Sequence, residues 1–143
     1  MQKNRKIKKI SILFIWIILL FSGCRDDIIN PDNKVGNANE PIILNNYRYF
    51  SFYLNADKMT YYVLEQAKID VTNFRLYISI DDYKAGYVEI AVSDNNNILL
   101  YSDRFSKKTD AFYKDISGSL PQRVVFNFSN FSGSLKFELI SLI

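Results

Sequence analysis

The chain has 143 residues and a formal net charge of +3, and it contains one cysteine and no histidine. Without histidine there is no Ser-His-Asp or Cys-His nucleophile, no histidine-bound zinc and no imidazole base near neutral pH, so an enzyme would depend on carboxylate or lysine chemistry. A single cysteine also excludes a fold held together by intrachain disulfides.

Residues 1–23 have the order of a secretory signal peptide. An apolar run extends from Ile10 to Phe21, with Ser11 as its polar interruption, and the small residues Ser22 and Gly23 follow it. Five cations precede the run: Lys3, Arg5, Lys6, Lys8 and Lys9. The run is about half the roughly 20 residues that a membrane-spanning helix requires, so its length favours a signal peptide over a spanning anchor.

The segment Phe21-Ser22-Gly23-Cys24 resembles the lipobox of bacterial lipoproteins, with Phe21 at the position where leucine is usual. The resemblance covers the targeting segment alone. It implies that signal peptidase II cleaves before Cys24 and that the sulfur of this residue carries a diacylglyceryl group. Two or more acyl chains anchor a protein stably, because each buried methylene contributes about 0.8 kcal/mol. The alternatives are an uncleaved signal anchor and an ordinary secretory signal followed by an incidental cysteine.

The next three residues, Arg25, Asp26 and Asp27, resemble the short acidic signals that send lipoproteins of Bacteroidota to the outer face of the outer membrane. The alternative is the start of a solvated linker. Residues 25–41 are polar and Asn-rich, which predicts a flexible tether with a span of roughly 20 to 25 Å. We therefore expect a lipid-anchored protein of the outer membrane, on the cell surface or on the periplasmic face.

Removal of residues 1–23 leaves 120 residues, enough for one domain with its own core. We expect an acylated cysteine and flexible linker over 24–41 and one folded domain over 42–143. Five of the 18 lysines and arginines lie in 1–23, which leaves 13 cations against 15 acids in the remainder. That part lacks the basic surface that phosphate backbones require, so nucleic acid is not expected as a partner.

Alternation of apolar and polar residues predicts a series of strands, along residues 47–54, 74–80, 87–92, 98–102, 124–128 and 135–139. Residues 59–67 are ambiguous. Met59, Val63 and Ala67 would share one face of a helix capped by Asp57, whereas the aromatic and β-branched residues at 60–63 favour a strand, and we predict a strand.

Two hairpins are expected from the same alternation. Around a turn at 81–86, keeping both apolar rows on one face favours pairing Ile78 with Ile90 and Tyr77 with Ala91, since a slip of one residue would expose a whole row. Around a second turn at 130–133, Phe126 should face Phe137.

Residues 104–110 are predicted to form a charged loop and residues 111–116 a short edge strand. About seven to nine short strands with turns every 8 to 12 residues then predict an all-β fold. We expect a small antiparallel β-sandwich of immunoglobulin-like or jelly-roll topology, preceded by the signal peptide and the tether.

Carboxylates in two predicted turns are weak candidates for a calcium site. Asp81 and Asp82 lie in the first turn, and Asp94 lies beside three asparagines in the next. Neither turn has the spacing of an EF-hand or its bidentate glutamate. Aspartate and asparagine are common in turns for backbone reasons alone, so we expect these residues to shape the turns and predict neither a metal nor another cofactor.

Tyr77 and Tyr87 are the candidate ligand contacts, because both project from the polar sides of their strands. Exposed tyrosines stack on sugar rings or anchor a protein partner. The alternative is structural, with the ring packed and the hydroxyl in water. No tryptophan occurs after Trp16, which removes the largest stacking surface from a carbohydrate site.

A glycosidase would need two carboxylates facing each other across a cleft, and no pair of acids lies in a recognisable motif. We therefore expect a membrane-anchored lipoprotein of the cell envelope that is not an enzyme and whose β-sandwich binds a glycan or an envelope protein. The alternative is a structural, assembly or inhibitor lipoprotein of the immunity type that acts through a protein partner.

Overall fold

The computed structural model describes residues 37–142. The predicted signal peptide, Cys24 and the acidic triplet at 25–27 lie outside the described residues. Within 37–142 no helix is long and apolar enough to cross a membrane. The strands of this part are β1 (Ile42–Asn45), β2 (Tyr49–Gln66), β3 (Phe74–Ser93), β4 (Leu99–Phe105), β5 (Thr109–Ile116) and β6 (Arg123–Ser141). They pair antiparallel, which confirms the predicted all-β class.

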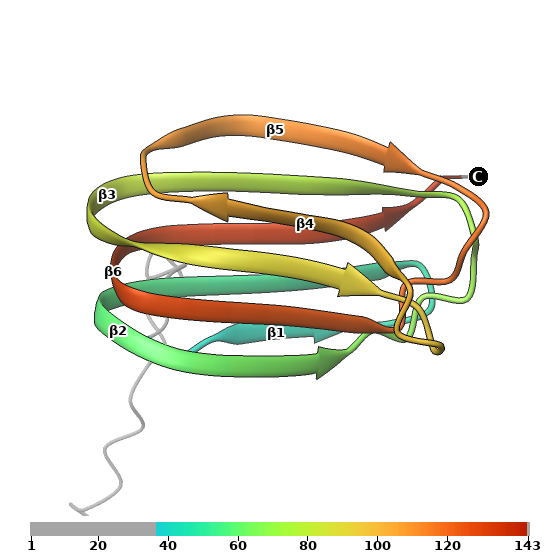
Figure 1. Cartoon of the computed structure of the whole chain (residues 1–143), viewed down its shortest axis with the longest axis horizontal. Coiled ribbons are helices and arrows are strands. Elements are labelled where there is room, and N and C mark those ends of the chain that lie inside the picture. The colour runs from blue at the N-terminus through green and yellow to red at the C-terminus, as the bar shows by residue number, and fades with distance from the viewer. Residues whose placement is uncertain (1–36, 143) are drawn as a thin grey trace, which may run out of the picture. The chain divides into compact units, whose positions relative to one another are not determined.

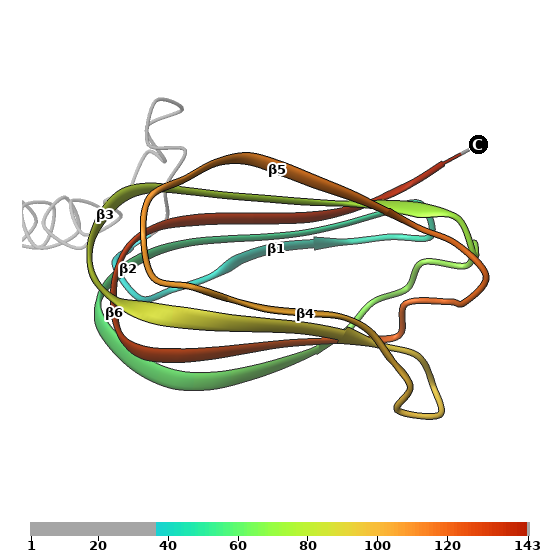
Figure 2. The same cartoon turned by 45° about the horizontal axis from the view of Figure 1, so that its top comes forward.

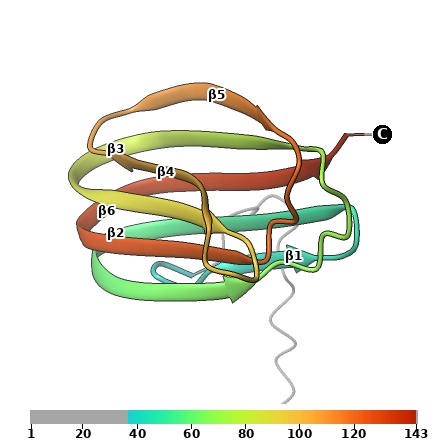
Figure 3. The ribbon, with the colours of Figure 1, turned by 45° about the vertical axis from the view of Figure 1, so that its right-hand side comes forward.

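Three strands, β2, β3 and β6, are long and bend near their midpoints (Figure 1). They contain 18, 20 and 19 residues, and their pairing is irregular where they bend. Positive φ angles mark the bends, at Lys58, Asp82, Gly86 and Asn130. Irregular pairing of this kind turns a strand out of its plane. Figure 3 shows the bends at one end of the domain.

Because of the bends, each long strand runs through both layers of a sandwich (Figure 2). The first layer has the order β1, first half of β2, second half of β6, first half of β3, β5. The second layer has the order second half of β2, first half of β6, second half of β3, β4. The predicted antiparallel β-sandwich is therefore confirmed, as one sheet folded over on itself.

The core between the layers is rich in phenylalanine. The ring of Phe126 in the second layer stacks on that of Phe52 in the first, with centroids 4.0 Å apart, and meets Phe137 edge-on at 5.2 Å. All three rings are fully buried. Burial of apolar surface contributes about 25 cal/mol per Å², so these contacts across the core hold the layers together.

The predicted pairing around residues 81–86 is wrong. The four residues concerned pair with β6 instead: Ile78 with Phe137, Ile90 with Phe126, Tyr77 with Glu138 and Ala91 with Val125. A strand that folds over buries both of its apolar rows, as a flat hairpin would. It also leaves room for β6 beside both halves of β3, and alternation alone does not distinguish the two arrangements.

The predicted contact between Phe126 and Phe137 exists, but the two rings meet across the core. They are not neighbours in a flat hairpin, because residues 123–131 of β6 belong to the second layer and residues 133–141 to the first.

The strand predicted at 59–67 is confirmed, since β2 continues to Gln66. The edge strand predicted at 111–116 is confirmed as part of β5, which pairs with β3 alone among the described strands.

The charged loop at 104–110 is shorter than predicted. Arg104 and Phe105 belong to β4, because Phe105 is buried and Arg104 pairs opposite Glu89. β5 then begins at Thr109.

Candidate functional site

The outer face of the second layer carries a row of polar side chains that crosses all four strands. Arg104 of β4 lies opposite Glu89 of β3, which lies opposite Asn127 of β6, which lies opposite Tyr62 of β2. Their chain neighbours, such as Val88 and Phe126, are buried in the core. Since successive residues of a strand point to opposite faces, the four side chains of the row face outward.

Three of these side chains form a hydrogen-bonded network. Arg104 donates from Nε to Oε1 of Glu89 at 2.9 Å and also donates to this oxygen from Nη2. Asn127 donates from Nδ2 to the other carboxylate oxygen, Oε2, at 3.0 Å. The guanidinium of Arg104 lies 4.4 Å from the ring centroid of Tyr87. The network fixes the orientation of Glu89 from both sides.

These hydrogen bonds set the protonation state of the carboxylate. The bonds from Arg104, and then the bond from Asn127, hold the pKa of Glu89 below its ordinary value. The bonds to Glu89 likewise raise the pKa of Arg104. Both groups are therefore charged at neutral pH.

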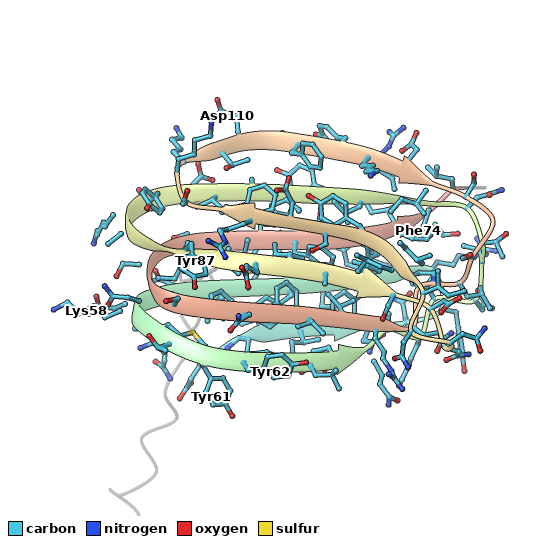
Figure 4. The ribbon with its side chains drawn as sticks, viewed as in Figure 1. Lys58, Tyr61, Tyr62, Phe74, Tyr87 and Asp110 are labelled. Atoms are coloured by element: carbon cyan, nitrogen blue, oxygen red, sulfur yellow. The ribbon has the colours of Figure 1, made fainter. Side chains whose placement is uncertain are left out.

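Beside the network lies a hollow of about 410 Å³. Ala91 and Val125, the next pair in register on this face, are small and line it. Tyr62 lines it from the edge strand, with 56% of the residue exposed, and Figure 4 shows this tyrosine on β2. Its lining is completed by Glu89, Asn127, Ser102, Asp103 and Arg104. An aromatic side chain thus stands beside fixed hydrogen-bonding groups over a partly apolar floor.

The outer face of the first layer carries a second group of tyrosines. The rings of Tyr77 and Tyr113 lie 5.1 Å apart, and the ammonium of Lys136 lies 4.9 Å from the ring centroid of Tyr77 and 5.4 Å from that of Tyr53. Lys136 also forms an ion pair with the buried Glu138 at 3.0 Å. Burial lowers the pKa of Lys136, but its contacts with Tyr53 and Glu138 outweigh burial and leave this pKa raised.

The structure does not bring the two predicted tyrosines together. Tyr77 lies on the outer face of the first layer and Tyr87 on that of the second. Tyr87 belongs to the neighbourhood of the hollow through its contact with Arg104 (Figure 4). Tyr77 instead packs between Tyr113 and Lys136.

Sequence reasoning missed the residues that line the hollow. Glu89 follows Tyr87 on the same side of one strand, so the alternation that identified Tyr87 could have identified Glu89 as well. Tyr62 was not selected, because residues 59–67 fitted either a helix or a strand and the face of Tyr62 was therefore not defined. The network itself joins residues 15 and 38 positions apart, a juxtaposition that only the register creates.

The calcium candidates lie at opposite ends of the second half of β3. Oδ1 of Asp94 accepts hydrogen bonds from the backbone N–H groups of Asn96 and Ile98, both at 2.8 Å, so this carboxylate closes its own turn. Asp81 and Asp82 lie at the bend, where Asp82 has a φ of +49°. Residues 37–142 contain no cluster of three or more acidic, histidine or cysteine side chains suited to a metal ion.

No family model and no curated protein matches the chain. Among solved structures, one described as "BiXyn10A CBM1 APO" aligns with a TM-score of 0.37 and 10% identity, over 71% of this chain and 87% of the other. A family 6 carbohydrate-binding module aligns with a TM-score of 0.29 and 11% identity, over 75% of this chain and 86% of the other. Similarity at this level does not assign the chain to a family.

Proposed function

We propose that this chain is a lipid-anchored lipoprotein of the cell envelope whose β-sandwich is a non-catalytic module that binds a glycan. The observation that carries the proposal is the hollow on the second layer. There the exposed ring of Tyr62 stands beside the network of Glu89, Arg104 and Asn127. The hollow is the binding site in this proposal.

The chemistry of the hollow suits a sugar. A pyranose ring has apolar C–H faces, which stack on an aromatic side chain, and hydroxyls, which need donors and acceptors of fixed orientation. An ionised carboxylate accepts about four hydrogen bonds, so Glu89 keeps capacity for about one hydroxyl beyond the two bonds from Arg104 and the one from Asn127. Charge-assisted bonds of this kind are about twice as strong as neutral ones.

The electrostatics of Glu89 favour binding over hydrolysis. A glycosidase requires a general acid whose pKa is raised so that it is protonated near neutral pH. Arg104 and Asn127 shift the pKa of Glu89 in the opposite direction. Glu89 is therefore suited to accept hydrogen bonds from a ligand and not to protonate a leaving group.

The first test compares Tyr62→Ala with Tyr113→Ala. The full-length protein, purified in detergent, is screened on a glycan array, and the affinity for the best oligosaccharide is measured by calorimetry. Loss of the stacking surface at Tyr62 should weaken binding about tenfold, or about 1.4 kcal/mol. Tyr113 is the matched control because it is 57% exposed but lies on the first layer. Equal effects of the two variants, or no glycan bound at all, would contradict the proposal.

The lipid anchor has its own test. In cells grown on labelled palmitate, the wild-type chain should carry the label and Cys24→Ser should lose it, because the acyl chains need the thiol and the new amino terminus of Cys24. A label retained by the variant, or absent from the wild type, would contradict the anchoring proposal and leave the binding proposal standing.

A second candidate function, interaction with a protein partner, is favoured by the edge of the second layer. Residues 59–66 of β2 pair with β6 alone among the described strands, and Tyr61 and Leu64 are 65% and 48% exposed. An open edge with apolar side chains can accept a strand from another protein. A photo-crosslinker placed at Leu64 tests this assembly or inhibitor role in cells. Capture of one stoichiometric protein partner would favour it, provided that the protein binds no glycan on the array.

A further inference from the structure

Resting on the proposed function, we propose that the ligand is an uncharged glycan, bound along an internal stretch of its chain that runs across the strands from β2 to β4. The binding site then has two further properties, a charge preference and a direction. The charge preference follows from the charged residues of the lining, and the direction follows from the order of the strands.

The charge preference follows from the residues that line the hollow. The single cation of the lining, Arg104, is already paired with Glu89, and the remaining charged residue, Asp103, is an acid. An acidic sugar would thus meet no uncompensated positive charge within the lining, and its own charge would have to approach the carboxylate of Glu89. Like charges at short range disfavour binding, whereas hydroxyl groups find acceptors and donors on Glu89, Asn127 and Arg104.

The direction follows from the order of strands. The row from Tyr62 through Asn127 and Glu89 to Arg104 runs perpendicular to the strands and crosses three gaps of about 4.8 Å each. Both ends of the row are edge strands, because within 37–142 the second half of β2 pairs with β6 alone and β4 with β3 alone. No further strand of the described domain therefore pairs with either end of the row, and a chain can continue past both edges.

The size of the hollow agrees with more than one sugar ring. Its volume of about 410 Å³ lies within the range of about 300 to 1,000 Å³ found for pockets that hold drug-sized ligands. Tyr62 and Arg104 stand at opposite ends of the row, about 14 Å apart across the three gaps, so a single sugar ring does not reach both. Successive sugars can contact Tyr62, Asn127 with Glu89, and Arg104.

The test uses the full-length protein in detergent and three sets of probes. The first is a length series of neutral gluco-, xylo- and manno-oligosaccharides, the second is the same series reduced at the reducing end, and the third is a series of oligogalacturonates. We expect affinity for the best neutral series to rise at least about tenfold from the monosaccharide to the tetrasaccharide. Reduction of the chain end should change the affinity for the tetrasaccharide less than about twofold. The uronates should bind at least about tenfold more weakly than neutral chains of the same length.

A charge substitution sharpens the test. Glu89→Gln removes the negative charge that pairs with Arg104, and we expect it to weaken neutral binding about tenfold and to raise uronate binding about tenfold relative to the wild type. Asp115→Asn is the matched control, because it frees Arg75 from a similar ion pair on the outer face of the first layer. This variant should change neither affinity.

The outcomes separate the two proposals. Uronates that bind as well as neutral chains would overturn the charge preference. Full affinity for the monosaccharide, or loss of binding on reduction of the chain end, would overturn the internal mode. In each case the proposal that the domain binds a glycan would still stand. That proposal would be contradicted if the protein bound none of the probes and nothing on the wider array.

Discussion

Replacing Phe126 by alanine is expected to lower the free energy of unfolding by about 3 to 5 kcal/mol, the usual cost of truncating a fully buried phenylalanine. The ring is fully buried and meets aromatic partners in the opposite layer, stacking on Phe52 at 4.0 Å and touching Phe137 at 5.2 Å. Its removal leaves a cavity at the contact between the layers. Chemical denaturation, followed by tyrosine fluorescence, measures the loss.

Two controls connect this loss to the contact between the layers. Tyr61→Ala, at a residue 65% exposed on β2, should cost less than about 1 kcal/mol. Phe126→Leu keeps much of the apolar volume, so it should remain folded and lose about 1 kcal/mol.

A double-mutant cycle between Phe126→Leu and Phe52→Leu should give a coupling of about 0.5 to 1.5 kcal/mol, because the rings stack across the core. A coupling near zero would contradict the observed arrangement of the layers. So would a finding that Phe126→Ala lowers the free energy of unfolding no more than Tyr61→Ala does.

The faces of the strands could be predicted from the sequence, because burial alternates with a period of two. The apolar rows of β3, for example, are buried as the alternation predicts: Phe74, Leu76, Ile78, Ile80, Val88, Ile90 and Val92. Alternation does not say which strand lies alongside. A chain reversal at 81–86 fits a flat hairpin and a folded-over strand equally well, and only the presence of β6 beside both halves distinguishes them.

The site was less predictable than the fold. Tyr87 could be placed on an outer face, but the hollow depends on the register of four strands from distant parts of the chain. Glu89 has a depressed pKa only because Arg104 and Asn127 lie opposite it. Side-chain type and spacing along one strand contain no information about such neighbours, so Glu89 could be placed on an outer face in advance, but its partners Arg104 and Asn127 could not.

Replacing Gly86 by alanine is expected to lower the free energy of unfolding by about 3 kcal/mol or more, for two reasons. The residue has a φ of +76°, a left-handed conformation that costs a residue with a Cβ about 1 to 2 kcal/mol. A Cβ built there would also lie 2.2 Å from the carbonyl oxygen of Asn130 and 2.4 Å from that of Ser129. The backbone of β6 would have to move, and forced displacement in a packed region costs a further 1 to 3 kcal/mol, roughly.

Gly118→Ala separates the two contributions. Gly118 has a φ of +94°, but no atom lies within 4 Å of the place where its Cβ would stand, so this variant should lose only about 1 to 2 kcal/mol. The difference between the two variants in chemical denaturation therefore measures how closely the bend of β3 approaches that of β6. Because Glu89 follows this bend, Gly86→Ala should also weaken binding in the hollow, and Gly118→Ala should not. Equal losses of stability for the two variants would show that the bends do not touch and that the long strands are not folded over as described.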